Sequence, residues 1–387
     1  MTAHEHASES MQDQRVFGLP ASDRTTLRRA RSLGLAILCV LGALSAPARA
    51  QQDKIVLKDG TQKVAKILSE DVDGLSYSLE GGSAGVRWDK VESIRYGSAD
   101  KYYVAADVFN AGRIDEALPM LTELAADTKM RPVLRQNVLF FIGLSHERQN
   151  KPDEALASYT QLLKDFPKSR YLLEVGSRML AIYLARGEAA QASKSIEAAV
   201  SAAQAAGLTP GVAAGFGLLR GKLLEAQGKF DDATGTYNKT VSEAGAEPDI
   251  VLAAKLGIAR CSQGAGRASE AEQRYREIIA TDAPAEVLAG AWNGLGDLSF
   301  DPAYSKRDTE GLLDGLFAYL RGVVLYVPTR GSASTEHERS LAGASKAFKA
   351  LGDLEKAADK KKSYLDRAKA CGDQLAALYP NSIYLKK

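Results

Sequence analysis

The chain offers few side chains that could carry out catalysis or bind a metal. It has four histidines and three cysteines in 387 residues. His146 and His337 stand alone in helical patterns, and the other two histidines precede residue 50. The chain has no His/Cys spacing typical of zinc sites and no glycine-rich phosphate loop. We therefore expect no catalytic residue, no metal site and no cofactor, with His146 in a packing position and His337 on the surface.

Carboxylates and thiols do not change this expectation. The acidic pairs Asp115-Glu116 and Asp231-Asp232 fall where helices should begin, and the helix dipole stabilises negative charge there without any catalysis. Cys261 and Cys371 could pair in an oxidising compartment. Because both lie in helical patterns far apart in the sequence, free buried thiols are the favoured interpretation.

The first fifty residues form a segment of a different kind. Arginines from Arg24 to Arg31 precede an apolar run from Leu33 to Leu44, and small residues follow at Ala48 and Ala50. This pattern predicts a secretory signal over 1–50 that is cleaved after Ala50. An uncleaved anchor is the alternative, although the apolar run is short for a membrane span. We expect an exported protein of the periplasm or cell envelope of a bacterium, associated with a membrane only through export or a partner.

The charge balance argues against nucleic acid as a ligand. Residues 1–50 hold six Lys/Arg and four Asp/Glu of the 50 and 48 in the chain, which leaves 44 of each sign in the mature part. A neutral surface of this kind lacks the basic face that nucleic-acid binding requires.

Residues 51–97 have the pattern of short strands separated by turns. The expected strands are Lys54–Lys58, Val64–Leu68, Leu75–Leu79, Gly85–Trp88 and Val91–Ile94. They predict a small, strongly bent antiparallel β domain. Their order resembles the small Sm-like or SH3-like barrels of bacterial envelope proteins. Trp88 is either a ligand platform or the aromatic plug of a small core, and a domain this small should dock on the helical part of the chain.

From about residue 98 the period becomes helical and an internal repeat appears. A turn residue is followed five positions later by alanine in the pairs Gly112/Ala117, Asn150/Ala155, Gly187/Ala192, Gly228/Ala233, Gly266/Ala271 and Gly352/Ala357. The first five alanines are spaced by 38, 37, 41 and 38 residues. Four positions after them stand Leu121, Tyr159, Ile196, Tyr237 and Tyr275. A helical hairpin repeated in this way buries its apolar face only by stacking on its neighbours.

The best-preserved unit is Leu139–Pro167, and Trp292, Leu295 and Gly296 of a later unit match the W-x2-L-G signature. Together these units resemble the tetratricopeptide repeat family, although their spacing exceeds that family's usual length of about 34 residues. The resemblance implies a mainly α fold: a tetratricopeptide-repeat-like, right-handed α-solenoid of about six to seven helical hairpins over 98–387, preceded by the small all-β domain.

The resemblance also implies a function. First helices of successive units line a concave groove in this family, and the positions that match are Tyr102, Phe109, Phe140, Glu147, Lys222, Arg260, Asn293 and Asp297. Exposed aromatic side chains there would anchor a peptide or partner protein, unless they pack against a neighbouring helix or the β domain. We expect a non-enzymatic scaffold, compatible with a homo-oligomer. The alternative is a cell-wall or polymer-anchoring protein that binds through the β domain and uses the solenoid as a spacer.

Overall fold

A computed structural model describes residues 52–205, 207, 209–243, 247–328, 334–380 and 382–386. The predicted signal and its cleavage site lie outside these residues.

The described chain begins with six short antiparallel strands. They are β1 (Asp53–Leu57), β2 (Gln62–Ala65), β3 (Ile67–Glu70), β4 (Gly74–Leu79), β5 (Gly82–Arg87) and β6 (Val91–Arg95), with the 3₁₀ turn η2 (Trp88–Lys90) before the last strand. The two three-stranded sheets have the orders β2-β1-β6 and β3-β4-β5. Only Lys66 separates β2 from β3, so one of the five expected segments is split between the two sheets. The small all-β region is confirmed, and its identity as an Sm-like or SH3-like barrel stays a prediction.

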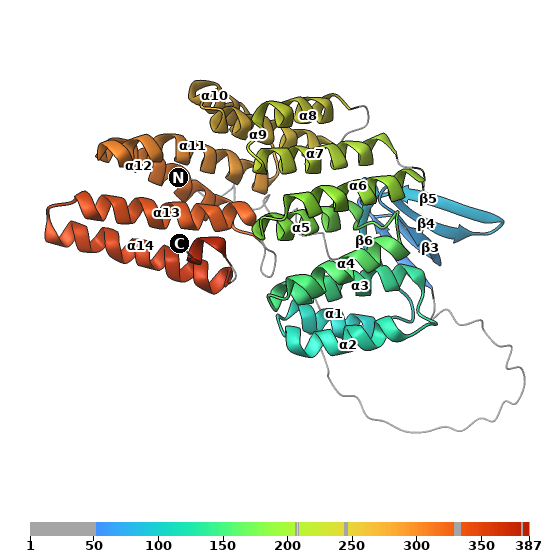
Figure 1. Ribbon diagram of the computed structural model, residues 1–387. Helices are drawn as coiled ribbons and strands as arrows, with labels where there is room; N and C mark the ends of the chain where they lie inside the picture. Colours follow the sequence, from blue (N-terminus) through green and yellow to red (C-terminus); the bar gives the residue numbers. More distant parts are fainter. Residues whose placement is uncertain are drawn as a thin grey trace, which may run out of the picture.

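The rest of the described chain is helical. Its helices are α1 (Asp100–Asn110), α2 (Ile114–Ala126), α3 (Pro132–Arg148), α4 (Pro152–Asp165), α5 (Leu172–Ala185), α6 (Ala189–Ala205), α7 (Pro210–Ala226), α8 (Phe230–Ser242), α9 (Pro248–Gly264), α10 (Ala268–Ile279), α11 (Ala285–Lys306), α12 (Thr309–Leu325), α13 (Thr335–Leu354) and α14 (Ala358–Leu378), followed by the 3₁₀ turn η3 (Ile383–Lys386). Consecutive pairs form hairpins that stack in chain order (Figure 1). Proline starts α3, α4, α7 and α9, where its missing N–H is not needed. The predicted solenoid is confirmed.

The marker residues shape the hairpin turns in the first five units. Gly112, Asn150, Gly187, Gly228 and Gly266 all have positive φ, between 56° and 80°. This left-handed conformation ends the first helix of each unit.

The last two units depart from the predicted pattern. The assignment of Gly352 as a turn residue is wrong, because Gly352 is buried inside α13, which continues to Leu354. In the sixth unit the extra residues lengthen α11 through Pro302 to Lys306, and Arg307 takes the left-handed conformation with φ 56°.

Each repeat packs a small residue against a large one. The marker alanines of the first five units are fully buried, as are Tyr159, Tyr237 and Tyr275. Gly221 lies so close to Tyr237 that an added Cβ would be 2.2 Å from a ring carbon. Gly257 of the next unit meets the same ring from its other side, at 2.4 Å. Absence of a side chain at these glycines is therefore what lets successive helices close around the tyrosine.

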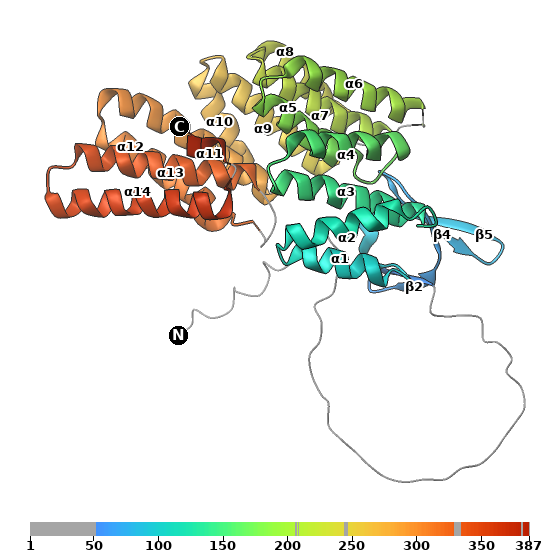
Figure 2. The same cartoon turned by 60° about the horizontal axis from the view of Figure 1, so that its bottom comes forward.

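The β region docks along one edge of the solenoid, as expected. It contacts the loops before α3, α5, α7 and α9, which are the entries to four successive units. The contacts are Arg131 with Asp53, Lys168 O with Val72 N, Thr209 with Asp73, and Glu247 with Arg87. Figures 1 and 2 show the strands beside these helix ends.

Two buried carboxylates fix this docking. Asp53 accepts two hydrogen bonds from Arg131, at 2.7 and 2.6 Å, and two more from backbone N–H groups. Glu70 pairs with Arg170 at 3.2 Å, and burial, only partly offset by Arg170, raises the pKa of Glu70. Because removing one partner of a buried ion pair is costly, the β region is a fixed part of the solenoid.

Candidate functional site

The aromatic end of the predicted groove is closed. Tyr102, Phe109 and Phe140 have exposed fractions of 9%, 1% and 0%, so of the two alternatives for these aromatic side chains, packing against their neighbours is the one observed. Phe140 stacks on Tyr171, with ring centroids 4.0 Å apart, and Phe109 packs edge-on against Phe141 at 4.9 Å. The family pattern places these positions in an open groove, but here aromatic side chains of the neighbouring unit and the strand edge cover them.

Glu147 and His337 also differ from what the sequence led us to expect. Glu147 is half-buried and bonded to both Tyr159 and Arg178, so it is not a free groove charge. His337 is fully buried, not on the surface, and its Nδ1 lies 2.9 Å from the Tyr379 hydroxyl. Burial lowers the pKa of His337. The other ring nitrogen, Nε2, is buried and makes no hydrogen bond within the described residues.

The other four predicted residues converge toward the C-terminal end. Arg260 lines a pocket of about 370 Å³ that is formed by α7, α9, α13 and the C-terminal segment. The residues that line the pocket are Glu225, Arg260, Gln263, Gly264, Thr335, Glu336, Arg339 and Tyr384. Because they come from units four, five and seven, the first helices must curve inward there. We call this cavity the concave pocket.

An ion-pair network forms its floor. Glu336 is buried and bonded to Arg260, and it accepts a hydrogen bond from Asn293 Nδ2 at 3.0 Å. Arg339 is bonded in turn to Asp297. Asn293 is itself fully buried, so it positions Glu336 and is closed to a partner, which corrects the prediction for this residue.

Charges within the network set its protonation. Burial would raise the pKa of Glu336, but Arg260 and then Arg339 outweigh it, and the net pKa is lowered. Burial raises the pKa of neighbouring Glu286, and the charge of Glu336 adds to this. Lys222 lies beside the network, where burial followed by the charge of Arg260 lowers its pKa. Glu336 is therefore the ionised carboxylate around which both arginines are arranged.

One donor in the network has no acceptor. Within the described residues, the buried Nε of Arg260 makes no hydrogen bond. A buried donor without a partner costs about 1–3 kcal/mol, and a carbonyl or carboxylate oxygen entering the pocket would remove that cost. The described residues contain no group of three or more His, Cys, Asp or Glu that could hold a metal.

Sequence reasoning missed most of the pocket lining. Glu225 and Gln263 could have been found, because each stands twelve residues before a buried tyrosine and accepts a hydrogen bond from its hydroxyl, at 2.8 and 2.6 Å. Glu336 and Arg339 have no such sequence marker, because the turn predicted at Gly352 put the last unit out of register.

Cys261 and Cys371 are both free, and burial raises the pKa of Cys261 to about 11.

Trp88, the alternative ligand platform, is partly covered. Its Nε1 donates to Asp71 O at 2.7 Å, and the Arg170 guanidinium carbon lies 4.2 Å from its ring centroid. Trp88 is partly buried against the core that contains the strand residues, and its contact with Arg170 also joins the β region to the solenoid.

The comparisons with known proteins concern the repeat. Residues 138–169 match the tetratricopeptide repeat family model. No curated protein sequence matches the chain. Among the described residues, no helix has the length and apolar character needed to cross a membrane.

Several solved structures are similar to the chain. A tetratricopeptide repeat protein from Parabacteroides merdae is 18% identical, with 70% of this chain and 98% of that chain covered and a TM-score of 0.42. PilW, a type IV pilus biogenesis factor, is 19% identical over 65% and 96%, with a TM-score of 0.39. BtubC from P. vanneervenii is 21% identical over 61% and 94%, also with a TM-score of 0.39. The chain thus carries a tetratricopeptide repeat within a tetratricopeptide-repeat-like solenoid that a small β region precedes.

Proposed function

We propose that the protein is an exported, non-enzymatic scaffold of the bacterial cell envelope that binds a segment of a partner protein in the concave pocket. The observation that carries this proposal is the convergence of polar side chains from three separate repeats on one cavity. Repeat solenoids generally bind partners along such concave surfaces. Export rests on the N-terminal segment, whose basic, apolar and small residues have the order of a secretory signal.

The lining of the pocket defines the chemistry of the partner. Arg260 and Arg339 offer N–H donors, whereas Glu225 and Gln263 offer acceptors at the rim. A polar segment with both donors and acceptors matches this lining better than an apolar anchor. An acceptor placed near Arg260 Nε would satisfy a donor that is left open among the described residues.

Affinity capture from the native envelope tests the proposal. Thr335 is an exposed residue at the rim and the first residue of α13, so Thr335→Trp should fill the entrance without disturbing the ion pairs. Thr309→Trp is the matched control, because Thr309 is the exposed first residue of α12 and lies outside the lining. We expect one discrete partner whose recovery falls at least tenfold with Thr335→Trp and is unchanged by Thr309→Trp. Equal recovery with both variants would refute the pocket as the binding site.

Export has a separate test. N-terminal sequencing of the protein recovered from cells should begin at Gln51. An intact first fifty residues would contradict cleavage after Ala50.

A further inference from the structure

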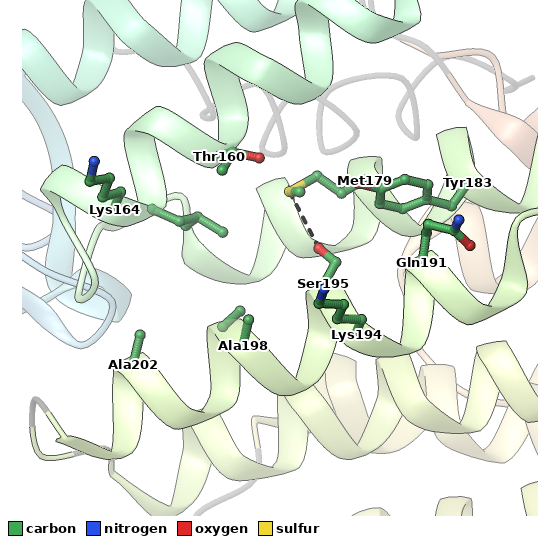
Figure 3. A pocket seen from close by; sticks show the side chains of 11 residues that line it. Thr160, Lys164, Met179, Tyr183, Gln191, Lys194, Ser195, Ala198 and Ala202 are labelled. Atoms are coloured by element: carbon green, nitrogen blue, oxygen red, sulfur yellow. Dashed lines mark hydrogen bonds between the residues drawn. The ribbon is translucent and has the colours of Figure 1, made fainter.

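A second cavity lies between α4 and α6, the second helices of units two and three. It has a volume of about 510 Å³ and is lined by Thr160, Leu163, Lys164, Met179, Tyr183, Gln191, Lys194, Ser195, Ala198, Ala199 and Ala202. Figure 3 shows α4 and α6 as its walls and Met179 and Tyr183 of α5 as its floor. We call it the lateral groove.

The groove exists because units two and three do not close on each other. α4 packs less extensively on α5 than α2 packs on α3 or α8 packs on α9. The β region spans the same junction: Val72 N donates to Lys168 O at 2.9 Å on one side, and Asp73 accepts from Thr209 at 2.7 Å on the other. Since two adjacent residues of the turn between β3 and β4 hold both loops, the gap is preformed.

Small and apolar side chains shape the interior of the groove. Met179 is buried on the floor, with its Sδ 3.9 Å from Ser195 Oγ. Ala198 and Ala202 present only methyl groups from α6, so the backbone of a guest helix could approach closely. Gln191 and Ala202 are eleven residues apart on α6, which is roughly 16 Å or three helical turns.

The charge at the rim has one sign. Lys164 on α4 and Lys194 on α6 are both exposed, and neither ammonium has an ion pair with the described residues. The lining includes no aspartate or glutamate. The nearby carboxylate of Glu197 is bonded to Arg220 through two contacts of 2.7 Å, so it does not neutralise Lys194.

We infer that the lateral groove binds an acidic amphipathic helix of a partner protein. About three turns of that helix lie along α4 and α6, its apolar side chains contact Met179 and Tyr183, and its carboxylates pair with Lys164 and Lys194. Helix-in-groove recognition reads apolar anchors at i, i+3/i+4 and i+7, which the groove length accommodates. This surface is independent of the concave pocket and of the proposal made for it.

The test uses a defined probe. A phage-displayed library of 16-residue amphipathic helices, with Asp, Glu, Lys, Arg and Gln varied on the polar face, is selected on the full-length chain. Counter-selection uses Ala198→Trp, which fills the groove from an exposed position. The best peptide is then labelled and its affinity measured by fluorescence anisotropy.

We expect the selected peptides to be acidic. Lys164→Glu combined with Lys194→Glu should weaken their binding at least tenfold, as should Ala198→Trp. The matched controls are Lys239→Glu combined with Lys349→Glu, and Ala126→Trp, all at exposed helical positions elsewhere. These should leave the affinity within twofold, and circular dichroism confirms that each variant is folded.

Three results would overturn the inference. One is the absence of any peptide enriched over the Ala198→Trp counter-selection. Another is enrichment of neutral or basic helices, or of acidic ones that the lysine reversals do not weaken. The third is co-sedimentation with phosphatidylglycerol vesicles that depends on Lys164 and Lys194 and competes with the peptide, because it would assign the groove to an anionic lipid.

Discussion

Adding one methyl group at Gly221 tests the packing on which the solenoid depends. In Gly221→Ala the new Cβ would lie 2.2 Å from Tyr237 Cε1, whereas carbon atoms in good contact are about 3.5–4.0 Å apart. The ring would have to move by more than an ångström. It has little room to do so, because Gly257 touches its other side and its hydroxyl donates to Glu225 at 2.8 Å.

The size of the effect reflects two opposing contributions. Overpacking a well-filled core costs about 1–3 kcal/mol, and alanine in place of glycine inside a helix returns about 1 kcal/mol. We expect Gly221→Ala to lower the free energy of unfolding by about 0–2 kcal/mol. Gly235→Ala on α8 is the control, since its added Cβ meets nothing within 4 Å and it should gain about 0.5–1 kcal/mol.

Urea unfolding followed by far-ultraviolet circular dichroism measures both variants, and hydrogen exchange over α7 to α9 locates the change. Combining Gly221→Ala with Tyr237→Leu should recover part of the loss, because a smaller side chain accepts the new methyl group. If Gly221→Ala stabilises the protein as much as Gly235→Ala does, the tyrosine-centred packing is refuted.

Two further variants test the buried ion pairs. Glu336→Gln should destabilise the protein at pH 7 by about 3–5 kcal/mol, because Arg260 then lacks its buried partner. Since the pKa of Glu336 is lowered on folding, the wild type should lose this stability as the pH falls from about 4.5 through the folded-state pKa. The variant should show no such loss, and thermal unfolding between pH 3 and 7 would show or contradict this difference. Arg131→Met leaves Asp53 buried without its ion-pair partner and should lower the free energy of unfolding in urea by about 3–5 kcal/mol. The exposed control Lys129→Met should change it by less than about 0.5 kcal/mol. Equal urea midpoints for the two variants would show that the β region does not depend on the ion pair.

The sequence predicted the features that depend on short-range pattern. Asn150 and Ala155 mark a turn and a packed helix because left-handed backbone and close approach each demand particular residue types. The strands around Asp73 and Gly74 were visible for the same reason. Repetition of these local signals was enough to predict a solenoid.

The candidate site depends on long-range geometry, and there sequence reasoning failed in part. Phe140 has the residue type of an exposed anchor, and nothing near it in the sequence indicates that Tyr171 covers it. Arg260 lines the concave pocket, but its ion-pair partner Glu336 lies 76 residues away in the sequence. Which residues meet across the concave face depends on the curvature of the whole array, which no single unit encodes.

The strand contacts along the solenoid edge have a mechanical consequence. A repeat array normally behaves as a chain of elements coupled only to their nearest neighbours, so each can bend or unfold with little cost to distant ones. Here a single β region is bonded at the entries to α3, α5, α7 and α9. Bending between any two of these units must break a contact to the strands, so this half behaves as one rigid block. The helices from α10 onward have no such contact with the strands among the described residues. The concave pocket lies between the two parts, with α7 and α9 in the block and α13 outside it, so a change in curvature on binding a partner would move α13 against a fixed wall.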